Sequence, residues 1–135
     1  MRETPEPDAG KPETTDTQEP ITGSSGAATG AVVRLRRGDR TMVVKSFRPV
    51  TSGRHVEAAR DPRHFAYWRR EPLAYASGLL PSGPFRAPRC YAVTDEAVYL
   101  EDVQGKPESP EVAARRLARG QGQTAIPDVP WLAGH

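Results

Sequence analysis

The stretch Thr41-Met-Val-Val-Lys-Ser-Phe47 places one cation inside an apolar, β-branched run that predicts a strand. The chain has sixteen arginines and three lysines, and among these lysines only Lys45 lies in such a run. A lysine ammonium is a compact charge on a flexible stem, whereas the guanidinium of arginine is a planar fork. A strand lysine often keeps its stem on apolar surface and its ammonium in water. Lys45 is therefore either such an edge residue or a ligand for an anion.

Two hairpins are predicted, and this strand belongs to the first. Residues 31–37 alternate in part between apolar and basic side chains, and Gly38-Asp39 is a turn signal that joins them to residues 41–47. Residues 90–93 and 97–100 form the second strand pair across a Thr-Asp-Glu turn. Strand pairs with a helix inserted between them indicate an α+β layer rather than a βαβ fold.

A helix is predicted between the hairpins. Asp61-Pro62 has the N-cap acid and the first-position proline that begin helices. Pro72 lacks a backbone N–H and disfavours helical geometry at Glu71, so we expect a kink or a break into two helical pieces there. A second helix begins at Ser109-Pro110-Glu111. The first helix has an apolar stripe at spacings of three and four, made of Phe65, Trp68, Pro72, Tyr75 and Leu79.

The first 22 residues differ in composition from the rest. They are rich in Pro, Glu, Asp and Thr, and Ile21 is their only large aliphatic residue after Met1. Such a segment buries too little apolar surface to offset its ordering entropy, so residues 1–22 are predicted to be a disordered acidic tail. Six acids against Arg2 and Lys11 give it a charge of −4, and the formal net charge of +2 leaves +6 on the remaining residues. That excess favours an anionic ligand and is also typical of a GC-rich genome.

Cysteine content and hydropathy indicate the cellular compartment in which the protein is expected. Cys90 is the only cysteine, which excludes an intramolecular disulfide framework and is typical of a reducing compartment. No apolar run approaches the length of about 18 residues that a membrane helix needs, and no signal-peptide pattern opens the sequence. We expect a cytoplasmic protein without a membrane span.

Four features of a nucleoside triphosphate site occur in the sequence in one order. Backbone N–H groups of a small-residue loop approach the phosphates, a lysine meets them as a point charge, a carboxylate anchors that lysine, and a strand edge pairs with adenine. Protein kinases use a glycine-rich loop, a strand lysine and a helix glutamate in this arrangement. Each feature also has a structural interpretation, such as a flexible linker for the glycines. The candidates are Gly23–Gly30, Lys45, Glu71 and Glu101-Asp-Val103.

The order and spacing of five segments narrow this interpretation: Val44-Lys45 with Arg48-Pro49, Tyr67-Trp-Arg-Arg-Glu71, Ala74-Tyr-Ala-Ser-Gly-Leu-Leu-Pro81, Arg86-Ala-Pro-Arg-Cys-Tyr91 and Leu100-Glu-Asp-Val103. Together they resemble the N-terminal lobe of the aminoglycoside phosphotransferase family, whose members are kinase-fold phosphotransferases of small molecules. The resemblance covers residues 23–133. It implies ATP-dependent phosphorylation of a hydroxyl group on a small molecule.

The resemblance also implies roles for individual residues at the phosphates. Lys45 would hold the α- and β-phosphates, and Glu71 would orient Lys45. The loop that contains Gly23, Gly26 and Gly30 would cover the phosphates. These glycines are spaced at three and four residues, and so depart from the G-x-G-x-x-G form of protein kinases.

At the base, the resemblance places Leu100 beside the adenine, whose edge would pair with the backbone of Glu101 and Val103. Transfer further needs a carboxylate that accepts the hydroxyl proton and acids that hold Mg²⁺. The family carries these in its C-terminal lobe, on a His-x-Asp loop and a later Asp, and this sequence has no His-x-Asp triplet. We therefore expect residues 23–108 to be the nucleotide-binding lobe, and residues 109–135 to be a helix and the start of a missing C-terminal lobe.

Such a chain would be truncated and inactive alone. A fragment, a split enzyme completed by a second chain with the C-terminal lobe, and a non-catalytic module are three origins that fit. A protein-interaction or regulatory module derived from a kinase lobe is the alternative function, and it would use the exposed wall of the cleft. Nucleic-acid binding is less favoured, because the cluster of Arg115, Arg116 and Arg119 is typical of a solvated helix face. The three histidines lack the spacing and company of a metal site.

Overall fold

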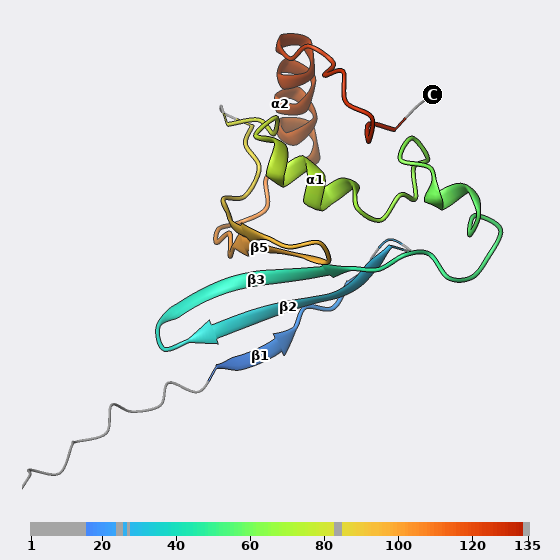
Figure 1. Cartoon of the computed structure of the whole chain (residues 1–135). Helices are drawn as coiled ribbons and strands as arrows, with labels where there is room; N and C mark the ends of the chain where they lie inside the picture. Colours follow the sequence, from blue (N-terminus) through green and yellow to red (C-terminus); the bar gives the residue numbers. More distant parts are fainter. Residues whose placement is uncertain (1–15, 24–25, 27, 83–84, 134–135) are drawn as a thin grey trace, which may run out of the picture.

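The computed structural model describes residues 16–23, 26, 28–82 and 85–133. Within them, five strands form one antiparallel sheet in the order β1-β2-β3-β5-β4, and two α-helices accompany it (Figure 1). This architecture confirms the predicted α+β class. In chain order the elements are β1 Thr17–Pro20, β2 Thr29–Arg37, β3 Arg40–Phe47, the 3-10 helix η1 Ala58–Arg60, α1 Arg70–Ser77, β4 Cys90–Val93, β5 Ala97–Glu101 and α2 Pro110–Gln123.

Both predicted hairpins are present in the sheet. β2 and β3 pair across Gly38, whose φ of 62° is the left-handed conformation that this tight turn uses. β4 and β5 pair across Thr94, whose Oγ1 accepts hydrogen bonds from the backbone N–H groups of Glu96 and Ala97. β5 also pairs with β3, which joins the two hairpins into one sheet.

The sheet has one more strand than the sequence predicts. Thr17–Pro20 was expected to lie in the disordered tail, and it forms the edge strand β1 against β2 instead. All four of its side chains are exposed, so backbone pairing with β2 rather than apolar burial orders it. Asp16, just before β1, accepts two hydrogen bonds of 2.6 Å from the Arg37 guanidinium at the end of β2. Residues 1–15 of the predicted tail lie outside the described residues.

The helix between the hairpins begins later than predicted. Asp61 does not cap a helix: its Oδ1 accepts a hydrogen bond of 2.9 Å from the N–H of Arg63, two residues on, and residues 61–69 form turns. α1 starts at Arg70, so Pro72 falls in the first helical turn, where a missing N–H leaves no hydrogen bond unmade. The predicted kink or break at Pro72 is therefore wrong. Phe65 is 68% exposed and does not belong to the buried stripe.

A small apolar core lies between the sheet and α1. α1 contacts β4 and β5, and so covers that half of one sheet face (Figure 1). Phe47 of β3 and Val98 of β5 are buried beneath it together with Leu100, and Val98 is fully buried. The half-buried side chains that pack against this cluster are Val43, Trp68, Tyr75 and Cys90.

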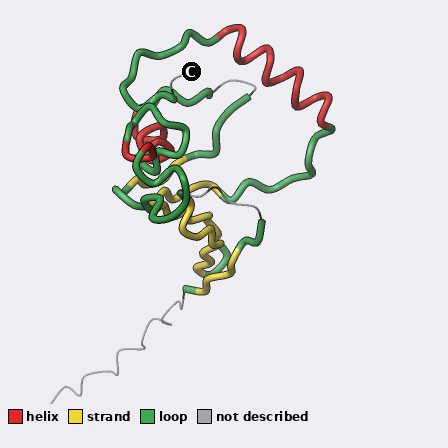
Figure 2. The backbone as a smooth tube through the Cα atoms, turned by 90° about the vertical axis from the view of Figure 1, so that its right-hand side faces the viewer, coloured by secondary structure: helices red, strands yellow, loops and turns green. Residues whose placement is uncertain are grey.

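α2 begins as predicted and stands apart from the sheet. The Ser109 side chain accepts a hydrogen bond of 3.3 Å from Val112 N, and Pro110 occupies the first helical position. Every residue of α2 except Gly120 is exposed, and α2 contacts no other helix or strand (Figure 2). Neither this helix nor any other in the described part of the chain has the length and hydropathy to cross a bilayer.

Candidate functional site

The structure brings Lys45 of β3 and Glu71 of α1 together. Lys45 pairs in register with Val98, and residues paired in this way point to the same face, so the Lys45 side chain lies on the side that α1 covers. Its Nζ is 2.7 Å from Glu71 Oε2 and 5.4 Å from the centroid of the Phe47 ring. The side chains of Lys45 and Glu71 are 27% and 35% exposed. The ammonium is thus anchored and still accessible to an anion.

The position of Glu71 follows from the way α1 begins. Glu71 is the second residue of the helix, where a carboxylate interacts favourably with the positive end of the helix dipole. The adjacent Pro72 is buried and holds the first turn against the sheet. Together these residues direct the Glu71 carboxylate away from the helix and toward β3, where Lys45 meets it.

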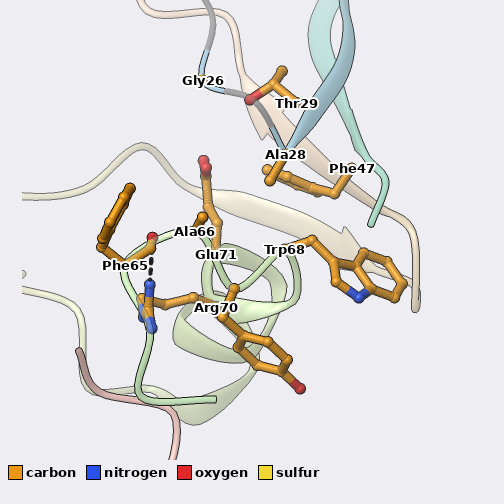
Figure 3. Close-up of a pocket in the computed structure, with 10 residues that line it drawn as sticks. Gly26, Ala28, Thr29, Phe47, Phe65, Ala66, Trp68, Arg70 and Glu71 are labelled. Carbon is orange, nitrogen blue, oxygen red and sulfur yellow. Dashed lines mark hydrogen bonds between the residues drawn. The ribbon is translucent and has the colours of Figure 1, made fainter. Parts of the chain in front are cut away.

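A cavity of about 350 Å³ lies beside this ion pair. Figure 3 shows the Glu71 side chain pointing from α1 into the cavity. Gly26 and Thr29 form the wall across from it. Three segments far apart in the sequence therefore meet here: the connection between β1 and β2, the end of β3, and the segment that enters α1. The lining residues are Gly26, Ala28, Thr29, Phe47, Phe65, Ala66, Tyr67, Trp68, Arg70 and Glu71.

The predicted glycines divide into two groups. Gly23 and Gly26 lie in the connection between β1 and β2, and a Cβ added to either would meet no atom within 4 Å. Gly30 was expected in the same loop and lies in β2 instead, where an added Cβ would come within 3.0 Å of Ser46 Oγ on β3. The close approach of two strands, not a phosphate, explains the glycine at position 30. Of the three, only Gly26 lines the cavity.

The three predicted base-binding residues differ in how accessible they are to a ligand. Leu100 is buried in the core and only 7% exposed. Its side chain is therefore covered by other residues and has no surface left for contact with adenine. The backbone N–H of Glu101 donates to Arg89 O at 2.8 Å, which leaves its carbonyl oxygen as the group for a ligand. Val103 is 61% exposed, and its backbone forms no backbone–backbone hydrogen bond within the described residues.

The side chain of Glu101 is held on the sheet face opposite Lys45. Its Oε1 and Oε2 accept hydrogen bonds from Arg86 at 2.8 and 3.2 Å, and Oε1 also accepts one from Arg89 N at 3.1 Å. These contacts, the Arg86 guanidinium foremost, lower the pKa of Glu101 to about 2. Glu101 is therefore a fixed anion over the whole physiological pH range.

Two arginines at the site were not singled out from the sequence. Arg34 of β2 forms a two-point ion pair with Asp102, and Arg70 of α1 donates to the carbonyl oxygens of Phe65 and Trp131 (Figure 3 draws the first of these). The Arg34 guanidinium also lowers the pKa of Asp102 below its ordinary value. Strand alternation does put Arg34 on the same face as Lys45, but the pattern of β2 contains no signal for a partner 68 residues away.

No three His, Cys, Asp or Glu side chains in residues 16–23, 26, 28–82 and 85–133 are grouped as a metal site would require. We assign no metal ligand among them. Comparison with known proteins adds no relative: no family model, no curated protein and no solved structure matches this chain.

Proposed function

We propose that this chain is the ATP-binding, N-terminal lobe of a kinase-like phosphotransferase that resembles the aminoglycoside phosphotransferases and acts on a hydroxyl group of a small molecule. The observation that carries the proposal is the contact of 2.7 Å between Lys45 Nζ and Glu71 Oε2. In protein kinases a lysine on the third strand pairs with the phosphates and with a glutamate on the following helix. Lys45 lies on β3, and Glu71 lies on α1, the first α-helix after that strand.

The surroundings of the ion pair support a phosphate site. Strand β1 makes residues 21–28 a connection between two strands, so Gly23 and Gly26 have the position of a phosphate-covering loop. A Cβ added to either glycine would meet no atom within 4 Å, so their side-chain positions leave room for the loop to approach a phosphate. Lys45 would neutralise that phosphate, and Glu71 would hold the ammonium in place before the nucleotide arrives.

The base would lie on the other side of Lys45, at the connector that follows β5. The carbonyl oxygen of Glu101 would be the acceptor that an adenine edge requires. The backbone N–H of Val103, which forms no backbone–backbone hydrogen bond within the described residues, would be the donor. Leu100 has no part in this version of the site because it is buried in the core.

Binding and transfer are separate in this proposal. The 135 residues contain no His-x-Asp triplet, and the described residues contain no metal-ligand cluster, so we assign them nucleotide binding and no catalytic step. The base that accepts the hydroxyl proton and the acids that hold Mg²⁺ would come from a polypeptide that carries the C-terminal lobe. The purified 135-residue chain is expected to bind ATP and to transfer no phosphate.

The proposal is tested by titrating the purified chain with ATP. Binding is measured by calorimetry and by the shift in thermal unfolding. Wild-type protein is expected to gain about 2.7 kcal/mol of stability at an ATP concentration 100 times the Kd. Lys45→Ala removes a charge-assisted contact of about 2 kcal/mol and is expected to weaken ATP binding about 30-fold. Glu71→Gln keeps the lysine and loosens it, with an expected loss of about threefold to tenfold.

Lys106→Ala is the matched control, since Lys106 is exposed and lies outside the cavity. It is expected to bind ATP as wild type does. Absence of ATP binding by the wild-type chain, or equal binding by the Lys45 and Lys106 variants, would refute a phosphate role for Lys45.

A second function is favoured by one observation, the exposure of α2. Val112 and Leu117 of this helix are 40% and 42% exposed, and the helix packs on no other element in the described chain. A protein-interaction or regulatory module would bind its partner through such a surface. In that case Lys45→Ala would leave partner binding unchanged, and Leu117→Asp would abolish it.

A further inference from the structure

The connector that follows β5 is tied to β2 by a part-buried ion pair. Arg34 Nε lies 2.8 Å from Asp102 Oδ2, and Nη2 lies 3.4 Å from Oδ1, so the guanidinium meets both carboxylate oxygens. The Asp102 side chain is only 5% exposed, although it belongs to a loop. Glu19 of β1 approaches the same guanidinium at 3.8 Å from the other side. One arginine thus links β1, β2 and the connector.

This ion pair lies on the same sheet face as Lys45. Val32 pairs in register with Lys45, and Arg34 pairs with Val43, so these four residues form a square on that face with the two cations at opposite corners. Two residues along a strand are about 7 Å apart. Val32 and Val43 occupy the remaining corners and are half-buried, and Val43 also packs against the core cluster. The square is therefore an apolar patch flanked by Lys45 and by Arg34, next to the half of the face on which α1 contacts β4 and β5.

The connector is also held from the opposite face. Glu101 points away from Lys45 and is fixed by Arg86, whereas Asp102 points toward the Lys45 face and is fixed by Arg34. Consecutive residues are thus anchored on both sides of the sheet. Residues 101 and 102 are thus anchored before any ligand binds, which lowers the ordering cost of recognition.

We propose that Arg34 is a positioning residue for the nucleotide base. By holding Asp102, it fixes the connector so that the carbonyl of Glu101 and the backbone of Val103 meet the edge of a purine that lies over Val32 and Val43. The Arg34 guanidinium closes the end of this subsite that is remote from the phosphates. This inference rests on the proposed function, because it concerns the base of the same nucleotide.

A comparison of ATP with inorganic tripolyphosphate tests the role of Arg34, since the two ligands share the phosphate chain and only ATP has the base. Calorimetry on the full 135-residue chain gives both affinities. Arg34→Gln is expected to weaken ATP binding about tenfold and to leave tripolyphosphate binding within twofold of wild type. Lys45→Ala is expected to weaken both ligands.

Arg37→Gln is the matched control. Arg37 lies on the same strand and also forms a two-point pair with an aspartate, Asp16, but at an exposed position outside the square. It is expected to change neither affinity. The reversed pair Arg34→Asp with Asp102→Arg restores the link between β2 and the connector, and is expected to regain part of the ATP affinity. This second variant keeps the test decisive if Arg34→Gln fails to fold.

Three results would overturn the inference. One is ATP binding by Arg34→Gln equal to that of Arg37→Gln. Another is an equal loss of ATP and tripolyphosphate in Arg34→Gln, which would mark a general structural or charge effect. The third is no ATP affinity in the reversed pair when that protein folds. Binding of ATP that depends on Lys45 but not on Arg34 refutes this inference alone, whereas no binding of ATP to the wild-type chain refutes the proposed function as well.

Discussion

Replacement of Arg70 by lysine keeps the charge at the start of α1 and removes the planar fork of donors. The structure gives this fork an unusual number of acceptors, all of them backbone carbonyls. A cation at a helix N-terminus is otherwise unfavourable because it faces the positive end of the helix dipole, so charge alone does not explain an arginine here. The Arg70 guanidinium donates to the carbonyl oxygens of Trp131 at 2.7 Å, Phe65 at 2.8 Å, Pro62 at 2.8 Å and His64 at 2.6 Å.

The cost of this replacement can be worked out from the burial of the four bonds. The bonds to Trp131 and His64 are part-buried, and the other two are exposed to water that can replace the donor. A hydrogen bond from a charged group contributes about 1.5 kcal/mol or more. A lysine ammonium donates from a single point, so it cannot reach the turn at residues 62–65 and Trp131 together. We expect Arg70→Lys to lower the free energy of unfolding by about 2 kcal/mol.

Thermal unfolding followed by circular dichroism measures this loss. For a domain of this size, about 1 kcal/mol corresponds to about 4 °C in Tm, so a fall of about 8 °C is expected. Limited proteolysis should also show earlier cleavage between residues 61 and 69. Arg69→Lys is the control, because Arg69 forms one ion pair of 3.0 Å with Asp95, whose side chain is 87% exposed. A surface pair of this kind contributes about 0.5 kcal/mol, so about 2 °C is expected. Equal losses of stability in the two variants would refute the explanation that Arg70 acts through its hydrogen bonds to backbone carbonyls.

Three further replacements test the core, the strand approach and the acid dependence. Val98→Ala truncates a fully buried valine and is expected to cost about 2 kcal/mol, measured as a lower urea midpoint with an unchanged m-value. Gly30→Ala puts a Cβ within 3.0 Å of Ser46 Oγ and is expected to cost about 1 kcal/mol, of which part returns in the double variant with Ser46→Ala. The pKa of Glu101 falls from 4.5 to about 2 in the folded protein, so the stability that it contributes is present above pH 4.5 and is lost as the pH falls toward 2. Arg86→Gln removes this contribution, and urea midpoints between pH 2 and pH 7 should then depend less on pH.

Each of these has a result that contradicts it. A Val98→Ala protein as stable as wild type would mean that the core around β5 repacks without a cavity. Strictly additive effects of the Gly30 and Ser46 replacements would show that their side chains do not compete for one space. An acid transition that is unchanged in Arg86→Gln would assign the low pKa of Glu101 to another cause.

The alternation of side chains along the chain was sufficient to predict both hairpins, since a period of two and a glycine turn are local properties. The start of α2 at Ser109-Pro110 was predictable for the same reason, because its cap is formed within four residues. The candidates Lys45 and Glu71 could also be chosen from the sequence, as a lysine in an apolar strand and an acid ahead of an apolar helical turn.

Other features depend on contacts between distant segments, and the sequence pattern did not predict them correctly. β1 has no apolar pattern, and it is ordered by backbone pairing with β2 and by Arg37, which only the folded sheet provides. Asp61 caps a turn rather than a helix, and α1 begins only where Arg70 can gather the carbonyls of that turn and of Trp131. The sequence by itself determined which residues alternate, turn and carry charge. The tertiary structure alone decided which of those charges meet, because Arg34 reaches Asp102, and Lys45 reaches Glu71, only after the sheet and α1 have assembled.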